Sequence, residues 1–131
     1  MKTVLFVCVH NSGRSQMAEA FFNQLAKGQA QAISAGTQPA ASVNPVAVEA
    51  MRQVGLDISH NNPKALTIEM LHQADRAITM GCGASDACPA GFVPSEDWAL
   101  PDPQGKSLAE VVRIRDEIKR RVVRLIEEFG E

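Results

Sequence analysis

The segment that most constrains the fold lies near the N-terminus, where an apolar run leads through a short loop into a helix. Residues 4–7 are apolar and favour a strand, Cys8 ends the run, and residues 16–27 favour a helix. The intervening loop can direct backbone N–H groups at a tetrahedral oxyanion, with the helix dipole behind it. Cys8 lies where a thiol would attack that anion, and the planar guanidinium of Arg14 would hold two of its oxygens. The segment therefore predicts a nucleophilic cysteine in an oxyanion-binding loop.

The composition of this loop agrees with that prediction. Gly13 permits close backbone approach, Asn11 tolerates the left-handed region, and Ser15 could donate to the Cys8 thiolate. The alternative is a buried cysteine that ends a strand beside an exposed Arg14. Cysteine-x5-arginine is a weak signal by itself, but its place between strand and helix favours a site. The predicted oxyanion-binding residues are Val9, His10, Asn11, Ser12, Gly13, Arg14 and Ser15.

Composition indicates an ordinary globular protein with a single domain over residues 1–131. Hydrophobic residues make up 45% and charged residues 21%, and the formal net charge is −2. This charge gives no reason to expect nucleic acid or a membrane surface as a partner. The sequence shows neither a signal-peptide pattern nor an apolar stretch of membrane-spanning length. We therefore expect a cytoplasmic monomer.

Strand-like and helix-like segments alternate along the chain. Strands are predicted over residues 3–7, 31–35 and 74–80, with a short edge strand near 96–99. Helices are predicted over residues 15–27, from 45 until Gly55 with Asn44-Pro45 opening the helix, over 68–73 and over 107–129. In the last helix, Ser107 and Glu110 form a predicted capping box, and Leu108 belongs to the predicted apolar face. This order predicts an α/β fold of three layers, αβα, with a four-stranded, mostly parallel sheet. Ligands of such folds bind beyond the C-terminal ends of the strands, where Cys8 and the segment 81–105 both fall.

Cys82 and Cys88 form a second group of candidate residues. A reducing compartment argues against structural disulfides, so the cysteines indicate a redox, catalytic or metal-binding role. In a continuous helix their Cα atoms would lie about 9 Å apart, whereas a disulfide needs roughly 4.4–6.8 Å. Pairing them would therefore require the segment to bend or unwind. A zinc site with Cys8 and His10 lacks the tight cysteine spacing of zinc knuckles, and two inert buried thiols are the plain alternative.

Asp102 is a candidate general acid, because a carboxylic acid on a rigid turn could protonate an oxygen that leaves the anion. The alternative is an ordinary Asp-Pro turn.

Together these residues resemble the arsenate reductases built on the low-molecular-weight protein tyrosine phosphatase fold. The resemblance rests on residues 8–19, Ser34-Ala35-Gly36, Asn44-Pro45, residues 54–59, Cys82 with Cys88-Pro89, residues 96–98, Asp102-Pro103 and residues 112–118. The loop alone fits both a phosphatase and a reductase. The paired downstream cysteines favour the reductase.

The resemblance implies a three-cysteine relay for arsenic detoxification. Cys8 would attack arsenate held by the loop amides and Arg14, while Asp102 protonates the departing oxygen. Cys82 would then attack the sulfur of Cys8, which releases arsenite. Cys88 would finally move the disulfide outward to Cys82–Cys88, where a thioredoxin reduces it.

Three further implications concern the family pattern. No tightly bound cofactor is expected, although some members bind potassium at positions that match Asn11, Glu19 and Ser34. Gly13 and His10 replace residues that are often cysteine and glycine in these reductases. Five residues separate the two relay cysteines, one fewer than in thioredoxin-linked members, so glutathione with glutaredoxin and mycothiol with mycoredoxin are alternative reductants.

Two other functions remain open from the residues. A tyrosine phosphatase would use Cys8, Arg14 and Asp102, and such enzymes usually have aromatic side chains near the acid. This chain has no tyrosine, and Trp98 is the one aromatic residue near Asp102 in the sequence. A sensor that binds an oxyanion or arsenite without turnover would signal through a partner. A DNA-binding element for such a repressor is not visible.

Overall fold

The computed structural model describes residues 2–80 and 95–129, so Cys82 and Cys88 lie outside the described residues. The strands are β1 (Lys2–Cys8), β2 (Ala30–Gly36), β3 (Arg76–Thr79) and β4 (Ser95–Asp97). The helices are α1 (Arg14–Leu25), α2 (Pro45–Arg52), α3 (Ile68–Gln73) and α4 (Leu108–Phe129).

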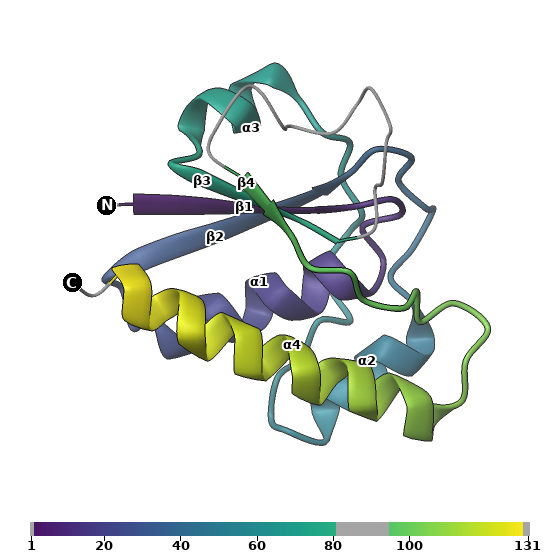
Figure 1. Cartoon of the computed structure of the whole chain (residues 1–131). Coiled ribbons are helices and arrows are strands. Elements are labelled where there is room, and N and C mark those ends of the chain that lie inside the picture. The colour runs from purple at the N-terminus through teal and green to yellow at the C-terminus, as the bar shows by residue number, and fades with distance from the viewer. Residues whose placement is uncertain (1, 81–94, 130–131) are drawn as a thin grey trace.

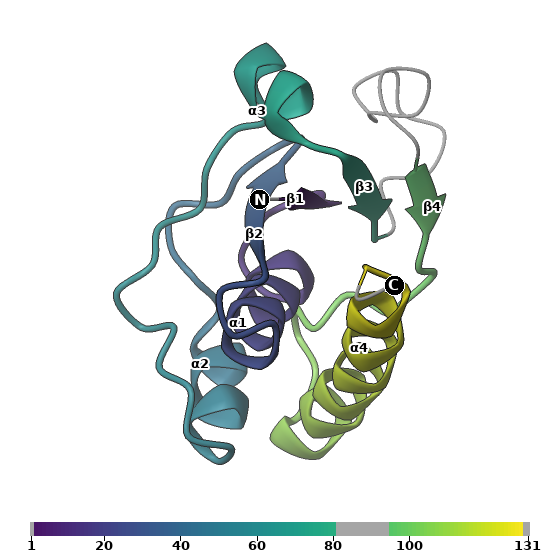
Figure 2. The same cartoon turned by 90° about the vertical axis from the view of Figure 1, so that its left-hand side faces the viewer.

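The strands form one sheet in the order β2-β1-β3-β4, and all three strand pairings are parallel. Helices α1, α2 and α4 cover one face and α3 covers the other (Figures 1 and 2). The predicted three-layer α/β fold is therefore confirmed. Cys8 at the end of β1 pairs with Gly36 at the end of β2, so both strands deliver their last residues to the same edge of the sheet.

The central strand β1 is buried on both faces, which explains its unbroken apolar sequence. On the side of α1 and α4, the ring of Phe6 contacts those of Phe22 and Trp98, with centroids 6.1 and 5.7 Å apart. On the side of α3, Leu5 and Val7 join a smaller apolar cluster. This two-sided packing fixes the position at which β1 delivers Cys8.

The ends of the helices show where the sequence-based boundaries were right and wrong. Asn44 caps α2 as expected, since its side chain accepts hydrogen bonds from the N–H groups of Val46 and Ala47. The predicted end of α1 at Lys27 is wrong. The helix ends at Leu25, because Lys27 (φ 52°) and Gly28 (φ 83°) both adopt left-handed backbone conformations.

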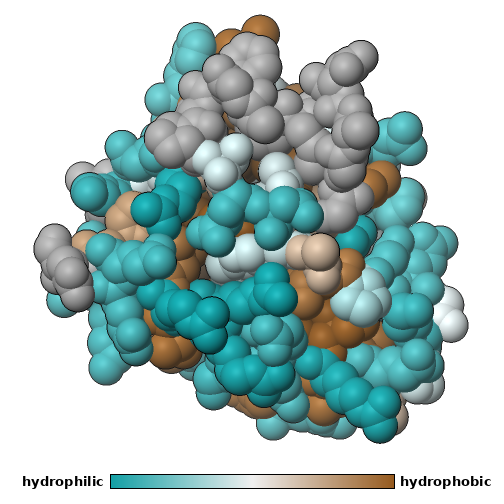
Figure 3. Space-filling model, viewed as in Figure 1, coloured by the Kyte–Doolittle hydropathy of each residue, from teal (hydrophilic) through white to brown (hydrophobic). Residues whose placement is uncertain are grey.

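The outer surface is mostly hydrophilic on the face shown in Figure 3, and the apolar areas there are small and separate. Leu108 was predicted to lie on the buried face of α4, but it is exposed at the first turn, and Ile114 and Arg115 are buried instead. In the part of the chain that the structure describes, no helix is long and apolar enough to cross a membrane.

The predicted capping box at the start of α4 is confirmed. The carboxylate of Glu110 accepts hydrogen bonds from the backbone N–H and hydroxyl of Ser107, and the Glu110 N–H donates to the Ser107 hydroxyl. The backbone N–H of Ser107, and then its hydroxyl, hold the pKa of Glu110 below its ordinary value of 4.5.

We expect Ser107→Ala to lower the free energy of unfolding by about 1 kcal/mol at neutral pH, because α4 loses its cap. A lowered carboxylate pKa stabilises the fold above the unfolded value and ceases to do so as pH falls through the folded value. The effect should therefore shrink below about pH 4.5 in urea titrations. Glu110→Gln, which removes the charge of the carboxylate in the same capping box, is the matched control variant. An equal loss for Ser107→Ala at pH 7 and pH 3 would contradict a charged capping box.

Candidate active site

Cys8 lies at the C-terminal end of β1, and only 2% of its surface is exposed. Its sulfur is 2.9 Å from the hydroxyl oxygen of Ser15 and accepts a hydrogen bond from the Asn11 N–H at 3.2 Å. Both residues belong to the loop and helix that follow the strand. The strand, loop and helix therefore converge on the thiol, as the sequence predicted.

The neighbouring hydrogen bonds leave the proton of the Ser15 hydroxyl available to the Cys8 sulfur. The backbone N–H of Lys64 donates to Asn11 Oδ1 at 2.8 Å, which fixes the orientation of the carboxamide. Asn11 Nδ2 therefore faces Ser15 and donates to its oxygen at 2.7 Å. Because that oxygen already accepts from Asn11, its own proton is free to point at the Cys8 sulfur. The Ser15 hydroxyl can therefore donate to the Cys8 sulfur.

The rest of the loop turns its carbonyl oxygens outward. The N–H groups of Thr37, Gln38, Ala40 and Asn44 donate to the carbonyl oxygens of Cys8, Val9, His10 and Ser12 at 3.1, 2.7, 3.0 and 2.8 Å, respectively. In a trans peptide, the carbonyl and the following N–H point in opposite directions. The N–H groups that follow these carbonyls therefore face the interior of the loop, where an oxyanion would lie.

Gly36 is a residue whose role the sequence analysis missed. It ends β2 directly beneath the loop, and a Cβ there would lie 2.7 Å from the Val9 oxygen and 3.0 Å from the Asn11 nitrogen. A side chain at this position would therefore push the loop off the sheet. A glycine at the end of the strand beside the predicted site was the signal available in the sequence.

Gln16 is a second residue that was missed, since its place in a predicted helix suggested no role in the site. It is fully buried, and its Nε2 donates to the carbonyl oxygen and to Oδ1 of Asn11 at 3.2 and 3.1 Å. Its own oxygen accepts from Asn61 Nδ2 at 3.0 Å. Gln16 therefore ties the left-handed Asn11 (φ 49°) to the segment that passes beside β2.

Arg14 and Asp102 are brought together from opposite ends of the chain. The Arg14 side chain is 6% exposed, its Nη1 donates to the Leu100 carbonyl at 3.1 Å, and its Nη2 lies 3.9 Å from Asp102 Oδ2. The Asp102 carboxylate is 45% exposed and also accepts from the Gln104 N–H. The candidate acid therefore lies beside the arginine predicted to hold the oxyanion.

The His10 side chain turns outward from the loop, with Nδ1 3.3 Å from the Gln38 carbonyl oxygen.

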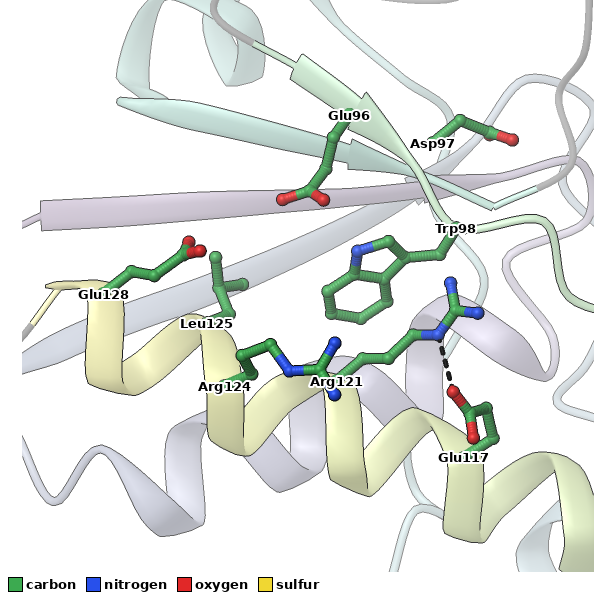
Figure 4. A pocket seen from close by; sticks show the side chains of 8 residues that line it. All are labelled: Glu96, Asp97, Trp98, Glu117, Arg121, Arg124, Leu125 and Glu128. Atoms are coloured by element: carbon green, nitrogen blue, oxygen red, sulfur yellow. Dashed lines mark hydrogen bonds and ion pairs between the residues drawn. The ribbon is translucent and has the colours of Figure 1, made fainter.

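Two cavities differ in what they offer chemically. One of about 430 Å³ adjoins the loop and includes His10, Ser12, Asn44 and Gln104 in its lining. Another of about 200 Å³ lies between β4 and α4 and is lined by charged side chains with Trp98 and Leu125 (Figure 4). Among the described residues that line the second cavity, none carries a thiol or hydroxyl nucleophile, whereas the first cavity adjoins the loop that holds Cys8. Trp98 is buried against Phe6 and does not form an exposed aromatic wall.

The three residues expected for potassium do not fit a bound cation. Among the described residues, Ser34 Oγ is the one buried side-chain polar atom without a hydrogen-bond partner. A free oxygen of this kind is what a potassium ligand would offer. Asn11 Oδ1, however, already accepts from Lys64 N–H and Gln16 Nε2, which occupies both of its lone pairs. Within residues 2–80 and 95–129, no hydrogen bond or ion pair orients the Glu19 carboxylate toward Asn11 or Ser34.

We expect Arg14→Lys to weaken binding of inorganic phosphate, used as an oxyanion probe, about 10- to 100-fold, since a charged hydrogen bond contributes about 1.5–3 kcal/mol. A lysine provides a point charge without the planar fork. Isothermal titration calorimetry measures the change, with the exposed Arg113→Lys as control. Equal affinity of the Arg14→Lys protein and the unmodified protein would exclude Arg14 from the oxyanion site.

Comparison with known proteins agrees with this geometry. The arsenate reductase 2 of Staphylococcus epidermidis is 42% identical over 120 residues, which cover 90% of this chain and 91% of that protein. The structure of a thioredoxin-dependent arsenate reductase of Corynebacterium glutamicum superposes with a TM-score of 0.84 and 36% identity over 99% of this chain and 62% of that one. An arsenate reductase in a phosphate-binding state gives a TM-score of 0.86 and 38% identity over 98% of both chains.

The family model described as low molecular weight phosphotyrosine protein phosphatase matches residues 3–131. The match spans β1, the loop that follows Cys8, the turn at Asp102 and α4. Together with the relatives, it confirms the resemblance drawn from the sequence. This chain belongs to the low molecular weight phosphotyrosine protein phosphatase family, and among its relatives are arsenate reductases.

Proposed function

We propose that this protein is an arsenate reductase that uses Cys8 as its nucleophile and Cys82 and Cys88 as a thiol relay. The observation that carries the proposal is the buried Cys8 sulfur, which faces the Ser15 hydroxyl and the Asn11 N–H inside a loop of inward-pointing amides. Its similarity over nearly the whole chain to proteins named arsenate reductase supports the choice of substrate.

The first step is the attack of the Cys8 thiolate on arsenic. A sulfur–arsenic bond forms, and one arsenate oxygen leaves as water after Asp102 supplies a proton. Arg14 and the loop amides neutralise the charge on the remaining oxygens. Arsenic remains in the +5 state at this point, so no electrons have yet been transferred to it.

The reduction follows when Cys82 attacks the Cys8 sulfur. A sulfur–sulfur bond forms, and the electron pair of the sulfur–arsenic bond goes to arsenic, which leaves as arsenite in the +3 state. Cys88 then attacks Cys82 and releases Cys8 as a thiolate. The resulting Cys82–Cys88 disulfide takes two electrons from a reductant.

Thioredoxin is the reductant that we propose, which implies a reducing compartment such as the cytoplasm. The thioredoxin-dependent enzyme of Corynebacterium glutamicum supports this choice. Glutaredoxin with glutathione and mycoredoxin with mycothiol are the alternatives to be compared.

We expect the protein to act as a monomer, since each residue of the proposed relay is present in one chain.

The proposal is tested by following arsenate-dependent NADPH oxidation with each of the three reductant systems. We expect steady turnover with thioredoxin and thioredoxin reductase, and none when arsenate or the protein is omitted. An absence of arsenate-dependent oxidation with every system would refute the proposal. Rapid hydrolysis of an aryl phosphate that persists in Cys82→Ser would then identify a phosphatase.

A further inference from the structure

Gly13 is explained by the space around it and not by its backbone angles. It precedes α1 with φ −140° and ψ −84°, so its φ is not in the left-handed region that favours glycine. A Cβ at this position would lie 2.6 Å from Cγ of Pro103, where ordinary contacts begin at 3.4 Å. The ring of Pro103 is thus seated directly on the one loop residue that lacks a side chain.

Pro103 belongs to a turn whose parts are linked to one another. Its side chain is buried, and its carbonyl accepts from the Lys106 N–H at 3.1 Å. The preceding residue, Asp102, accepts from the Gln104 N–H at 3.0 Å. Because a proline ring is covalently part of the backbone, it can yield to a side chain at residue 13 only by changing its pucker or by moving the main chain beside Asp102.

The other side of the turn is held by Arg14, the residue next to Gly13. Its guanidinium donates to the Leu100 carbonyl and lies 3.9 Å from the Asp102 carboxylate. Adjacent residues of the oxyanion loop therefore hold the turn on both sides of Asp102, Arg14 by polar contacts and Gly13 by close packing.

We propose that Gly13 and Pro103 are positioning residues for Asp102, an inference that rests on the proposed arsenate reductase function. The missing side chain at position 13 lets the turn lie against the loop, and this contact sets the distance of the acid from the departing oxygen. The Gly13 N–H keeps its place in the oxyanion loop, while the missing Cβ at position 13 and the ring of Pro103 touch none of the reacting atoms. Their effect on the rate passes through the carboxylate of Asp102.

The test is a double-mutant cycle between Gly13→Ala and Asp102→Asn, read as kcat and KM for arsenate with thioredoxin in excess. Since misplacing a catalytic group by about 1 Å can cost about 100-fold, we expect Gly13→Ala to lower kcat roughly 10- to 100-fold. KM should change less than about threefold, because the loop amides still bind the anion. In the Asp102→Asn background, the same substitution should lower kcat by less than about twofold.

Two results would overturn the proposal: an unchanged kcat in Gly13→Ala, or losses that multiply in the double variant. The latter would mean that the alanine damages the loop itself. Protein that shows no arsenate reduction before any substitution would instead refute the proposed function. The matched control is Gly55→Ala, where no atom lies within 4 Å of the added Cβ. Its left-handed backbone (φ 82°) makes the alanine cost stability, but the strain falls on the turn after α2 and not on the loop, so kcat should be unchanged.

Rescue provides a second and independent readout. Pro103→Ala removes Cγ, the atom in conflict, and keeps Cβ, which lies at an ordinary 3.6 Å from the position that an alanine Cβ would take at residue 13. Gly13→Ala/Pro103→Ala should therefore recover most of the kcat lost in Gly13→Ala, and a failure to recover would contradict the contact. If Gly13→Ala does not fold, Pro103→Ala is compared with and without Asp102→Asn. Its loss should vanish in the Asn background, and a loss that persists there would overturn the proposal.

Discussion

Cys8→Ser is expected to abolish arsenate reduction, with arsenate-dependent NADPH oxidation falling at least about 10⁴-fold. A serine hydroxyl is a weak nucleophile and cannot form the disulfide that supplies two electrons to arsenic. The substitution also replaces the sulfur that contacts Ser15 and accepts from the Asn11 N–H by a smaller hydroxyl oxygen. The loop amides and Arg14 remain, so phosphate should still bind in a calorimetric titration.

The binding measurement distinguishes a chemical defect from a folding defect. Retained phosphate affinity with lost turnover is the outcome that supports a nucleophilic Cys8. Turnover of Cys8→Ser above one hundredth of the original rate would exclude the thiol as the attacking group. The circular dichroism of both proteins should coincide, because the serine differs from cysteine by a single atom.

Cys88→Ser is expected to limit the protein to one arsenite per chain, however much thioredoxin is supplied. Cys8 and Cys82 can still complete the two-electron reduction, but their disulfide then has no partner to move it outward. Cys82→Ser should release no arsenite, because the sulfur–arsenic adduct is not resolved. Arsenite released per chain is the quantity to measure, in the presence of thioredoxin and thioredoxin reductase.

Ser85→Ala is the matched control for this pair, since it alters the same stretch of sequence without removing a thiol. It should turn over repeatedly. Repeated turnover of Cys88→Ser at a rate near that of the original protein would show that the reductant reaches the Cys8–Cys82 bond directly. The relay would then end at Cys82.

The fold could be predicted from local patterns because the strongest elements agree with their tertiary environment. The apolar run of β1 is buried on both faces, and the Asn44 cap starts α2 where expected. The end of α1 was missed because Lys27 adopts a left-handed conformation, which a lysine seldom does. The exposure of Leu108 was missed because helical periodicity identifies a face but not where that face leaves the core.

The candidate site was predictable only as far as its residues are adjacent in sequence. Cys8, Arg14 and Ser15 lie within eight positions, and a strand–loop–helix pattern is enough to bring them together. The support of Asn11 by the Lys64 N–H joins positions 53 residues apart, and no local pattern predicts it. The contact of Gly13 with Pro103 likewise depends on how the turn folds back over the loop.

The central claim is that the oxidation of Cys8 passes to Cys82 and then to Cys88. Peptide mapping of the disulfides after one turnover, without reductant, tests it most directly. The account predicts a Cys82–Cys88 disulfide in the original protein and a Cys8–Cys82 disulfide in Cys88→Ser, each formed with one equivalent of arsenite. Arsenite released with all three cysteines still reduced, or a Cys8 that never appears in a disulfide in Cys88→Ser, would contradict it.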